Sequence, residues 1–346
     1  MTLPRALFNC NVWGAPFVRR FVDLVLPCQL APGNLGDLPG IADGLYLIGT
    51  TEEDRGAIAA APATRMLARL MPVEYVTDID RTFHKYRILN RYQNVAMIRA
   101  VAGDFGAFVP TYADQVWAAG SFRAALGRIG AGAAGVFTQG PRGAESGFAG
   151  KILARRAGGI AAIPPRALVQ LFLRHRHPFE DAFFVDAPRF TSYPSHVNWR
   201  VGNEGLVVHN FHLHPVALRV MGERPIFTTV FAETLDSAFL DDLLKADDPI
   251  HVVADSDELF MCSLDDDLEL GSALIGERPF DLSELALFAM SRVRPLGLRF
   301  WRETCLYRSG EIEGPTWKAA IASARSTAET LLAIVEQVRR QNAAKN

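Results

Sequence analysis

The motifs that mark several large enzyme classes are missing from the places where those classes carry them; the glycines of GAGAAG, Gly130 and Gly132 among them, come late in the chain and more simply serve turns. No G-x-G-x-x-G follows its first apolar run, and it contains no G-x-x-x-x-G-K-[ST], no G-x-S-x-G and no H-E-x-x-H. These motifs cradle a pyrophosphate, cradle a triphosphate, expose a nucleophilic serine and bind zinc, respectively. Their absence argues against dinucleotide oxidoreductases, P-loop kinases, serine hydrolases and zinc peptidases.

Cysteine and long apolar runs are also scarce. The four cysteines (Cys10, Cys28, Cys262 and Cys305) are scattered and form no C-x-x-C pair, so they indicate neither a zinc site nor a disulfide framework. The first residues, MTLPRALFNC, lack the apolar core of a signal peptide, and no apolar run reaches membrane-spanning length. We therefore expect a reduced, cytoplasmic protein without a transmembrane segment.

Neither sign of charge dominates the chain. The formal net charge is −2, so the composition gives no indication of a nucleic-acid partner. The stretches GKILARRAGGI and LVQLFLRHRHP combine basic and apolar residues and leave a peripheral membrane contact open. Solvated helix faces explain them more simply.

Apolar runs alternate with helical patterns through the first half of the chain. We expect strands within 6–14, 44–50, 72–79, 105–121 and 133–140. The clearest helix covers 85–103, where Ile88, Tyr92, Val95 and Ala96 share one face. This alternation predicts an α/β fold: a mostly parallel sheet in a three-layer α/β/α arrangement, with ligands bound beyond the carboxyl ends of its strands.

The second half is less regular. Residues 206–220 (LVVHNFHLHPVALRV) and 250–257 (IHVVADSD) have the pattern of strands, and the chain from about 276 onward is mainly helical. We therefore expect an α/β domain over 1–275 and a helical carboxyl-terminal extension over 276–346, packed on that domain.

Three of the eight histidines crowd into one apolar stretch. If 206–220 is one strand, His212 and His214 project from the same face, and His209 from the other. Two histidines on one face suit a metal clamp that a carboxylate completes. A buried, hydrogen-bonded histidine beside an exposed one explains the spacing equally simply.

Acidic residues follow the next apolar run. Asp255 and Asp257 offer the oxygen ligands that Mg²⁺ or Mn²⁺ prefers, or carboxylates for proton transfer. The alternative is a helix cap, since Ser or Asp here would satisfy free amide groups. If the strands are neighbours, His212 or His214 should lie near these carboxylates at the sheet edge that also holds Asp114.

The first half offers its own polar residues at predicted strand ends. Asp114 follows the fourth strand, where a parallel sheet delivers functional groups. Thr50 and Thr51 follow the second strand, and either cap a helix or contact a ligand. Gly120 and Ser121 open a helix whose amide groups could meet an anion.

Several blocks together resemble uncharacterised bacterial glycosyltransferase-like proteins of the GT-A type. The blocks are ADQVWAAGSFRAAL, PPRALVQLFLRHRHP, GLVVHNFHLHPVAL and VVADSDEL, and the order of elements agrees over about residues 5 to 265. The resemblance implies a GT-A-like fold and a nucleotide-sugar donor. It also implies transfer of the sugar to a bacterial glycan, a lipid-linked acceptor or a small molecule.

The resemblance assigns roles to particular positions. Base and ribose contacts would come from the first two strands, at Asn9, Asn11, Thr50, Thr51 and Glu52. The helix before the fourth strand would contact the diphosphate through Lys85, Arg87 or Asn94. The fourth strand would end in an Asp-x-Asp metal motif, but this sequence has Asp114 alone.

This departure leaves the metal site open among three arrangements. Asp114 binds Mn²⁺ or Mg²⁺ together with His214, or Asp255 and Asp257 supply ligands, or no metal is used. For catalysis we select Asp255, Asp257 and His212, because inverting transfer needs a base for the acceptor hydroxyl.

Two alternatives to a transferase also stay open. A metal-dependent hydrolase would bring His212, His214, Asp255 and Asp257 to one point. A degenerate, non-catalytic glycosyltransferase domain would bind the nucleotide without turnover.

Overall fold

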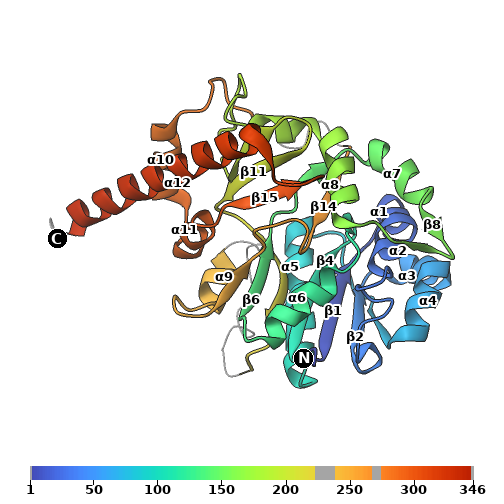
Figure 1. Ribbon diagram of the computed structural model, residues 1–346. Helices are drawn as coiled ribbons and strands as arrows, with labels where there is room; N and C mark the ends of the chain where they lie inside the picture. Colours follow the sequence, from blue (N-terminus) through green and yellow to red (C-terminus); the bar gives the residue numbers. More distant parts are fainter. Residues whose placement is uncertain (1, 223–237, 267–273, 344–346) are drawn as a thin grey trace.

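A seven-stranded central sheet organises the protein, a computed structural model of which describes residues 2–222, 238–266 and 274–343 (Figure 1). Its order is β13-β6-β12-β4-β1-β2-β3, and only β12 runs antiparallel to its neighbours. The strands are β1 (Ala6–Asn11), β2 (Leu45–Gly49), β3 (Val73–Val76), β4 (Ala107–Tyr112), β6 (Gly135–Thr138), β12 (His214–Arg219) and β13 (Ile250–Val252). The predicted mostly parallel sheet is confirmed.

Helices cover both faces of this sheet, and for that reason β1 and β2 are buried along their whole length rather than at alternate residues. On one face Phe8 of β1 contacts Phe122 of α6, with ring centroids 5.4 Å apart, and Tyr46 of β2 donates to Gln29 of α2. On the other face Tyr92 of α5 lies against Gly49. The helices of this part are α1 (Ala15–Arg20), η1 (Phe21–Val25), α2 (Leu26–Gln29), α3 (Glu52–Ala60), α4 (Pro62–Leu70), α5 (Lys85–Ala102) and α6 (Ser121–Gly130).

Three central strands continue past their carboxyl ends into a second sheet. β4 leads into β5 (Gln115–Trp117), β6 into β7 (Arg142–Gly143) and β13 into β14 (Met261–Leu264). These continuations pair in the order β5-β14-β7. A second sheet therefore follows directly beyond the carboxyl edge of the central sheet. Asp114 lies at the bend between β4 and β5.

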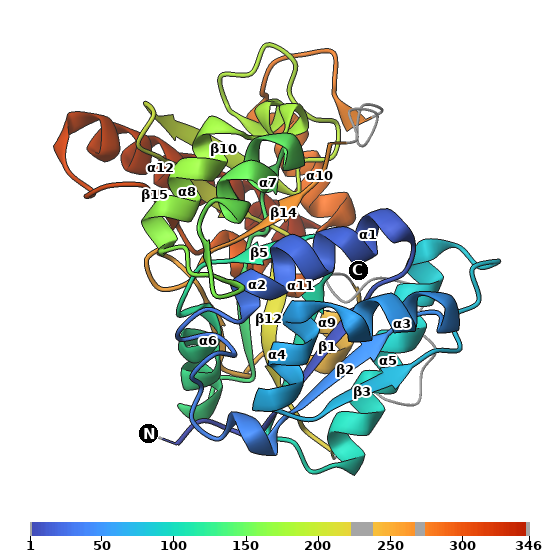
Figure 2. The ribbon, with the colours of Figure 1, turned by 90° about the vertical axis from the view of Figure 1, so that its right-hand side faces the viewer.

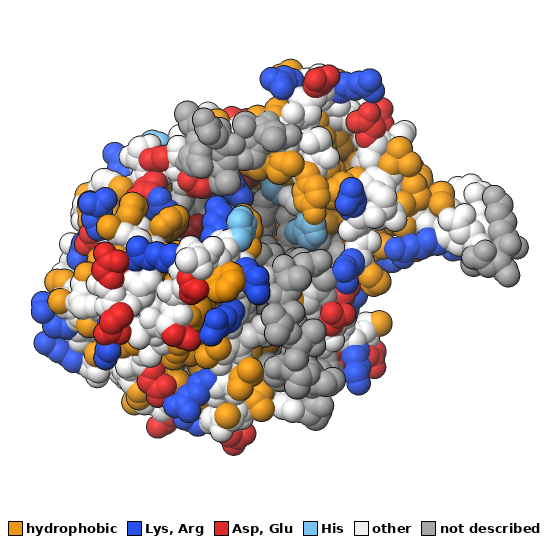
Figure 3. Space-filling view, turned by 180° about the vertical axis from the view of Figure 1, so that it is seen from behind, with side chains coloured by type: hydrophobic (Ala, Val, Ile, Leu, Met, Phe, Trp, Pro, Cys, Tyr) orange, Lys and Arg blue, Asp and Glu red, His pale blue; other side chains and the backbone are white. Residues whose placement is uncertain are grey.

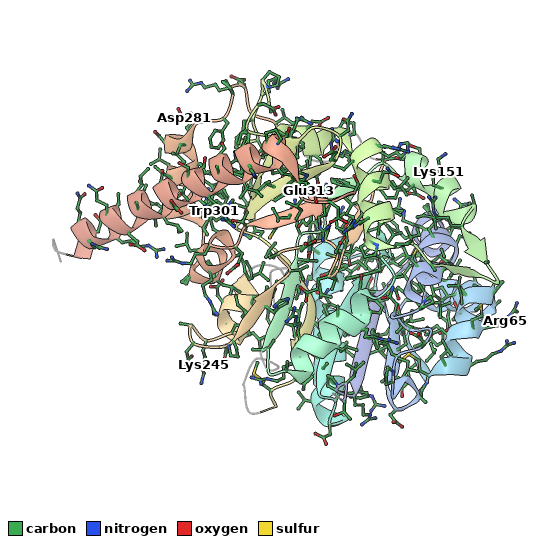
Figure 4. The ribbon with its side chains drawn as sticks, in the orientation of Figure 1. Arg65, Lys151, Lys245, Asp281, Trp301 and Glu313 are labelled. Atoms are coloured by element: carbon green, nitrogen blue, oxygen red, sulfur yellow. The ribbon has the colours of Figure 1, made fainter. Side chains whose placement is uncertain are left out.

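A third sheet contains β10 (His196–Val201), β11 (Gly205–Asn210) and β15 (Cys305–Arg308). Trp199 and Val207, from one of its faces, join a core with the carboxyl-terminal helices. These helices are α10 (Leu282–Arg292), α11 (Pro295–Trp301) and α12 (Gly314–Ala343). α12 crosses this sheet and extends beyond the body of the molecule (Figure 1), and Trp301 lies beneath it (Figure 4). We call β10, β11 and β15 the small sheet.

The remaining elements connect those already described, and α7, α8 and α9 among them can be followed in Figure 2. They are η2 (Ile41–Asp43), α7 (Glu145–Leu153), β8 (Arg156–Ala157), β9 (Ile160–Ala161), α8 (Pro165–Arg174), η3 (Pro178–Phe183) and α9 (Ala238–Leu243).

The prediction of one strand over 206–220 is wrong. The segment forms β11 in the small sheet and β12 in the central sheet, with 211–213 crossing between them. Phe211 packs on Trp301, 4.1 Å between ring centroids, whereas Leu213 joins the main core. Because the two apolar side chains belong to different cores, the chain changes sheets here, and the face assignment of the three histidines no longer follows from alternation.

The carboxyl-terminal part is mainly helical but not wholly so. It also contributes β15, which pairs with β11 through four residue pairs from Gly205–Arg308 to Val208–Cys305. Since this strand belongs to a sheet that begins at His196, the division at residue 275 stays a prediction. Among the described residues, no helix is both long and apolar enough to cross a membrane.

His209 should make the stability of the protein depend on pH. Its ring is buried between Trp199 and Trp301, and its Nδ1 donates to the Trp301 carbonyl oxygen over 2.9 Å. Burial lowers the pKa of His209 to about 4. The unfolded state thus binds a proton first as pH falls, and on the order of 3 kcal/mol of stability is lost between about pH 6.5 and pH 4.

Urea unfolding of the wild type and of His209→Gln across this pH range measures the loss. The variant should be less stable at pH 7 and show a shallower pH dependence. Parallel curves for the two proteins would contradict a neutral, buried His209.

Candidate active site at the carboxyl edge of the central sheet

The order of the central sheet marks one place for a ligand. From β1 the chain proceeds to β2 and β3 on one side, and then returns to β4 on the other. Ligands of open α/β sheets bind at such a switch point, beyond the carboxyl ends of the strands. Here Asn11 of β1 and Tyr112 of β4 are paired at this end, and Asp114 follows two residues later.

Asp114 is a half-buried carboxylate surrounded by charged groups. Its backbone carbonyl accepts from Leu264 of β14 over 2.8 Å, which fixes the bend that carries it. Burial raises the pKa of Asp114; Arg20 opposes this shift, Asp265 adds to it and His214 opposes it. The structure therefore brings the two residues predicted as metal ligands, Asp114 and His214, to the same place.

Two of these neighbours were not predicted. Asp265 directly follows β14, in the run LDDDLE, and its amide donates to Gly143. Arg20 ends α1, and its Nε donates to Glu145 of α7 over 2.7 Å. A strand that ends in three aspartates was a detectable signal for Asp265. Nothing in the sequence around Arg20 marked it, because only the packing of α1 against α7 brings it here.

Asp266 serves a different purpose from Asp265. Its two carboxylate oxygens accept from the amide of Ser146, at 3.2 and 3.0 Å, in the first turn of α7. A carboxylate at this position satisfies a free amide and suits the helix dipole. Asp266 is therefore a helix cap, while Asp265 faces Asp114.

The donor residues predicted on β1 and β2 lie at this edge. Asn9 is buried and donates to the Leu47 carbonyl over 3.1 Å, so it joins β1 to β2. Asn11 lies nearer the edge, where Gly49 leaves room for it: a Cβ on Gly49 would come within 2.3 Å of Asn11 Oδ1. Thr50 is buried, and its hydroxyl has no hydrogen-bond partner among the described residues.

Thr51 acts as the cap of α3. Its hydroxyl accepts from the amide of Asp54 over 3.1 Å and contacts Arg81 at 3.2 Å. Glu52 is exposed in the first turn of the same helix, 3.5 Å from Arg55. The capping alternative thus holds for Thr51, and its nucleotide contact stays a prediction, as does that of Glu52.

The face of α5 that meets the sheet is polar towards its amino-terminal end. Gln93 donates to the Tyr112 hydroxyl over 3.1 Å, and the Tyr112 ring contacts that of His214. The side chain of Asn90 and the Oδ1 of Asn94 are buried without a hydrogen-bond partner in the described structure. Lys85 and Arg87 are exposed, against the rings of Tyr86 and Phe83. Asn94 therefore fits its predicted position better than Lys85 or Arg87 does.

His212 lies beside Tyr193 and Asp241. Its ring stacks with that of Tyr193 at 6.0 Å, and its charge acts on Asp241 of α9. His212 belongs to the crossing and His214 begins β12, so the two histidines do not project from one face of a single strand.

Asp255 and Asp257 belong to a network of ion pairs. Arg308 Nε lies 3.0 Å from Asp255, and its Nη2 lies 2.6 Å from Asp257. Arg166 lies 2.9 Å from Asp257, and Asp255 also accepts from the amide of Asp257. The expectation that a histidine accompanies these carboxylates holds for neither: their partners are arginines. Their catalytic role stays a prediction.

No group of three or more His, Cys, Asp and Glu side chains that could hold a metal ion occurs in residues 2–222, 238–266 and 274–343. His212, His214, Asp255 and Asp257 all lie within these ranges, so they do not converge on one metal. The geometry required by the hydrolase alternative is therefore missing.

The start of α6 is closed to an anion. The amide of Phe122 donates to Asn34 over 3.0 Å, and that of Arg123 donates to the Gly33 carbonyl over 2.9 Å. Gly33 and Gly120 both have positive φ, and a Cβ on Gly33 would reach Gly120 Cα at 2.5 Å. The glycines here serve backbone packing.

Comparisons with known proteins add little to this geometry. No protein-family model matches the chain, and no curated protein sequence does so. Among solved structures, the mannosyltransferase PcManGT from Pyrobaculum calidifontis, in complex with GDP-Man and Mn²⁺, is similar over 99% of this chain and 81% of that chain. The sequence identity is 14% and the TM-score 0.39. At these values the similarity assigns neither a ligand nor an activity to this chain.

Replacing Arg308 by Met should destabilise the protein. Arg308 is only 13% exposed and faces two carboxylates, which would lose a cation without gaining solvent. Because both carboxylates are partly exposed, we expect a loss of about 2 to 3 kcal/mol in urea unfolding. Arg278→Met is the matched control: Arg278 is 81% exposed, and its ion pair with Glu284 should contribute less than about 0.5 kcal/mol. Equal stability of the two variants would argue against a structural network.

Replacing Asp114 by Asn should not destabilise the protein at pH 7. Since the folded pKa of Asp114 is raised, its ionised form opposes folding above the unfolded pKa. The amide keeps the shape and removes the charge, so the free energy of unfolding should stay within about 1 kcal/mol of the wild type or exceed it. The free energy of unfolding of Asp114→Asn, relative to that of the wild type, should be greater at pH 7 than at pH 3.5. A large loss at pH 7 would show that Asp114 has a structural ion-pairing role instead.

Proposed function

We propose that the protein is a glycosyltransferase of the GT-A type, which transfers a sugar from a nucleotide-diphosphate donor. The observation that carries this proposal is the position of Asp114. It follows the fourth strand of the central sheet, beside the switch point between β1 and β4, and keeps a half-buried carboxylate there among Arg20, Asp265 and His214. A carboxylate with a raised pKa at a strand end is typical of a functional site.

The donor nucleotide would lie over the carboxyl ends of β1 and β2. Asn11 and Thr50 point polar groups to this end, and the Thr50 hydroxyl is buried without a partner in the described chain. Asn90 and Asn94 of α5 also keep unpaired amide atoms. Because an unpaired buried polar group costs about 1–3 kcal/mol, these groups support a polar ligand between α5 and this end of the sheet. The matching roles of Asn9, Thr51, Glu52 and Arg87 rest on the resemblance alone.

A divalent cation fits the two carboxylates. Burial is the main cause that raises the pKa of Asp114, and the charge of Asp265 adds to it; a cation beside both carboxylates would favour their ionised forms. Mg²⁺ is commonly held by one or two carboxylates, with water and substrate phosphates as its other ligands. Asp114 and Asp265 would hold it together with water and the donor phosphates, and the ion would stabilise the charge of the leaving diphosphate. These two carboxylates and His214 do not form a three-ligand metal group in the described chain, so the ligand role of His214 stays a prediction.

The protein's own groups account for the rest of the chemistry. Arg20, held in place by Glu145, adds a positive charge for the diphosphate. A base must take the proton of the acceptor hydroxyl. The predicted base is His212, which lies beside Tyr193 and Asp241, with Asp255 and Asp257 as the alternatives. The acceptor class (glycan, lipid-linked sugar or small molecule) and the cytoplasmic location stay predictions.

A thermal-shift series with UDP, GDP and CMP, each with and without Mn²⁺, tests the proposal. At a concentration of about 100 times Kd, the bound nucleotide should stabilise the protein by about 2.7 kcal/mol. Asp114→Asn should lose the part of the shift that depends on Mn²⁺. Asp247→Asn, a change at an exposed position, should keep it.

If no nucleotide raises the melting temperature, the proposed function is wrong. If a nucleotide binds but no donor sugar is released or transferred in its presence, the protein is the degenerate, non-catalytic form.

A further inference from the structure

The two faces of the small sheet differ sharply in polarity. Val197, Trp199 and Val207 face the carboxyl-terminal helices and belong to their apolar core. His196 and Asn198 alternate with these residues, so they face the opposite way, towards the carboxyl edge of the central sheet. Both are more than nine-tenths buried. A strand face that carries a histidine and an asparagine in the interior requires partners that an apolar core does not supply.

A buried carboxylate meets this face. Glu180 of η3 is 3% exposed, and its Oε2 lies 3.4 Å from His196 Nε2. Its Oε1 accepts from the amide of Arg142 over 2.8 Å, and the His196 ring stacks on Phe183 at 3.9 Å. The other ring nitrogen of His196 lies 3.1 Å from Ser195 Oγ. Glu180 and His196 are thus fixed in orientation.

Polar atoms without a partner concentrate around this pair. Besides Glu180 Oε2 and His196 Nε2, which face each other at 3.4 Å, three buried atoms have no hydrogen-bond partner in the part of the chain that the structure describes: His177 Nε2, Asn198 Oδ1 and Arg142 Nη1. The backbone brings them together, since the amide of His177 donates to Arg142 and that of Glu180 to His177. Three unpaired polar atoms beside a buried ion pair are costly unless a ligand or ordered water satisfies them.

We propose that this cluster, which we call the Glu180 site, binds a hydroxyl-rich carbohydrate. Hydroxyl groups both donate and accept, and the cluster contains donors and acceptors in mixture. A phosphate would be repelled by Glu180, and a metal ion lacks a third ligand here. Phe183 adds an apolar ring face at the same place. The role of this carbohydrate as the acceptor of the sugar transfer rests on the function proposed above.

The Glu180 site adjoins the Asp114 site. Cys262 of β14 is buried between them, and its pKa is raised by burial, then by Glu180 and by Asp114. Towards the surface, Ser195 is half-buried and Tyr193 is 42% exposed. Histidine, lysine and arginine side chains gather near the middle of the face seen in Figure 3. A carbohydrate at Glu180 would therefore lie one strand away from the carboxylates that would hold the donor.

Saturation-transfer NMR with methyl glycosides of hexoses, deoxyhexoses and N-acetylhexosamines tests this proposal without nucleotide. At least one glycoside should bind, and Glu180→Gln should weaken it about tenfold or more. Ser195→Ala, at a half-buried position that folding tolerates, should weaken it several-fold. Glu204→Gln, an exposed glutamate in the turn between β10 and β11, is the matched control and should bind as the wild type does. Inorganic phosphate should not displace the glycoside.

Two results would overturn the proposal. One is that no glycoside in the panel binds the wild type. The other is that binding is unchanged in both Glu180→Gln and Ser195→Ala, which would leave ordered water as the only occupant of the Glu180 site. The nucleotide-dependent thermal shift of Glu180→Gln separates the two proposals. A variant that keeps the shift but loses the glycoside supports both, whereas glycoside binding without any nucleotide response would refute the transferase alone.

Discussion

The structure depends on three chain segments that take part in two sheets. β4, β6 and β13 pair in the central sheet, and the strands that follow them, β5, β7 and β14, pair in a second sheet beyond its carboxyl edge. Backbone groups in these strands are satisfied on both sides of the bends, so the bends themselves are held rigidly. Asp114, Gln139 and Asp255 all lie in such bends. Polar residues that would be mobile in ordinary loops are thereby fixed at the place where an α/β sheet binds its ligands.

The small sheet is attached to this arrangement through acidic residues. The amide of Ser256 donates to Leu306, and that of Leu306 to Ala254, so β15 is hydrogen-bonded to the bend after β13. Arg308 then pairs with both carboxylates of that bend. This attachment gives Asp255 and Asp257 a structural role, because they carry the charge that joins the carboxyl-terminal part to the central sheet. The apolar face of the small sheet packs in the carboxyl-terminal core, and its polar face carries the proposed Glu180 site.

Local sequence predicted the elements whose physical causes are local. The periodicity of α5 and the apolar runs of the central strands were visible in the sequence, because burial of one helix face or of both strand faces requires apolar residues at regular positions. The position of Asp114 after the fourth strand followed from the same reasoning. The break at 211–213 did not, because Phe211 and Leu213 are equally apolar and only the core that each joins distinguishes them.

The sequence by itself therefore determined the α/β class, the parallel core of the sheet and the strand end that carries Asp114. Tertiary structure decided which charges surround that carboxylate. Arg20, His214 and Asp265 come from positions far apart in the chain and act on Asp114 only because α1, β12 and β14 meet at one edge. It also decided that Asp255 and Asp257 face arginines rather than histidines. Electrostatic interactions depend on distance in space, and separation along the chain does not reveal that distance.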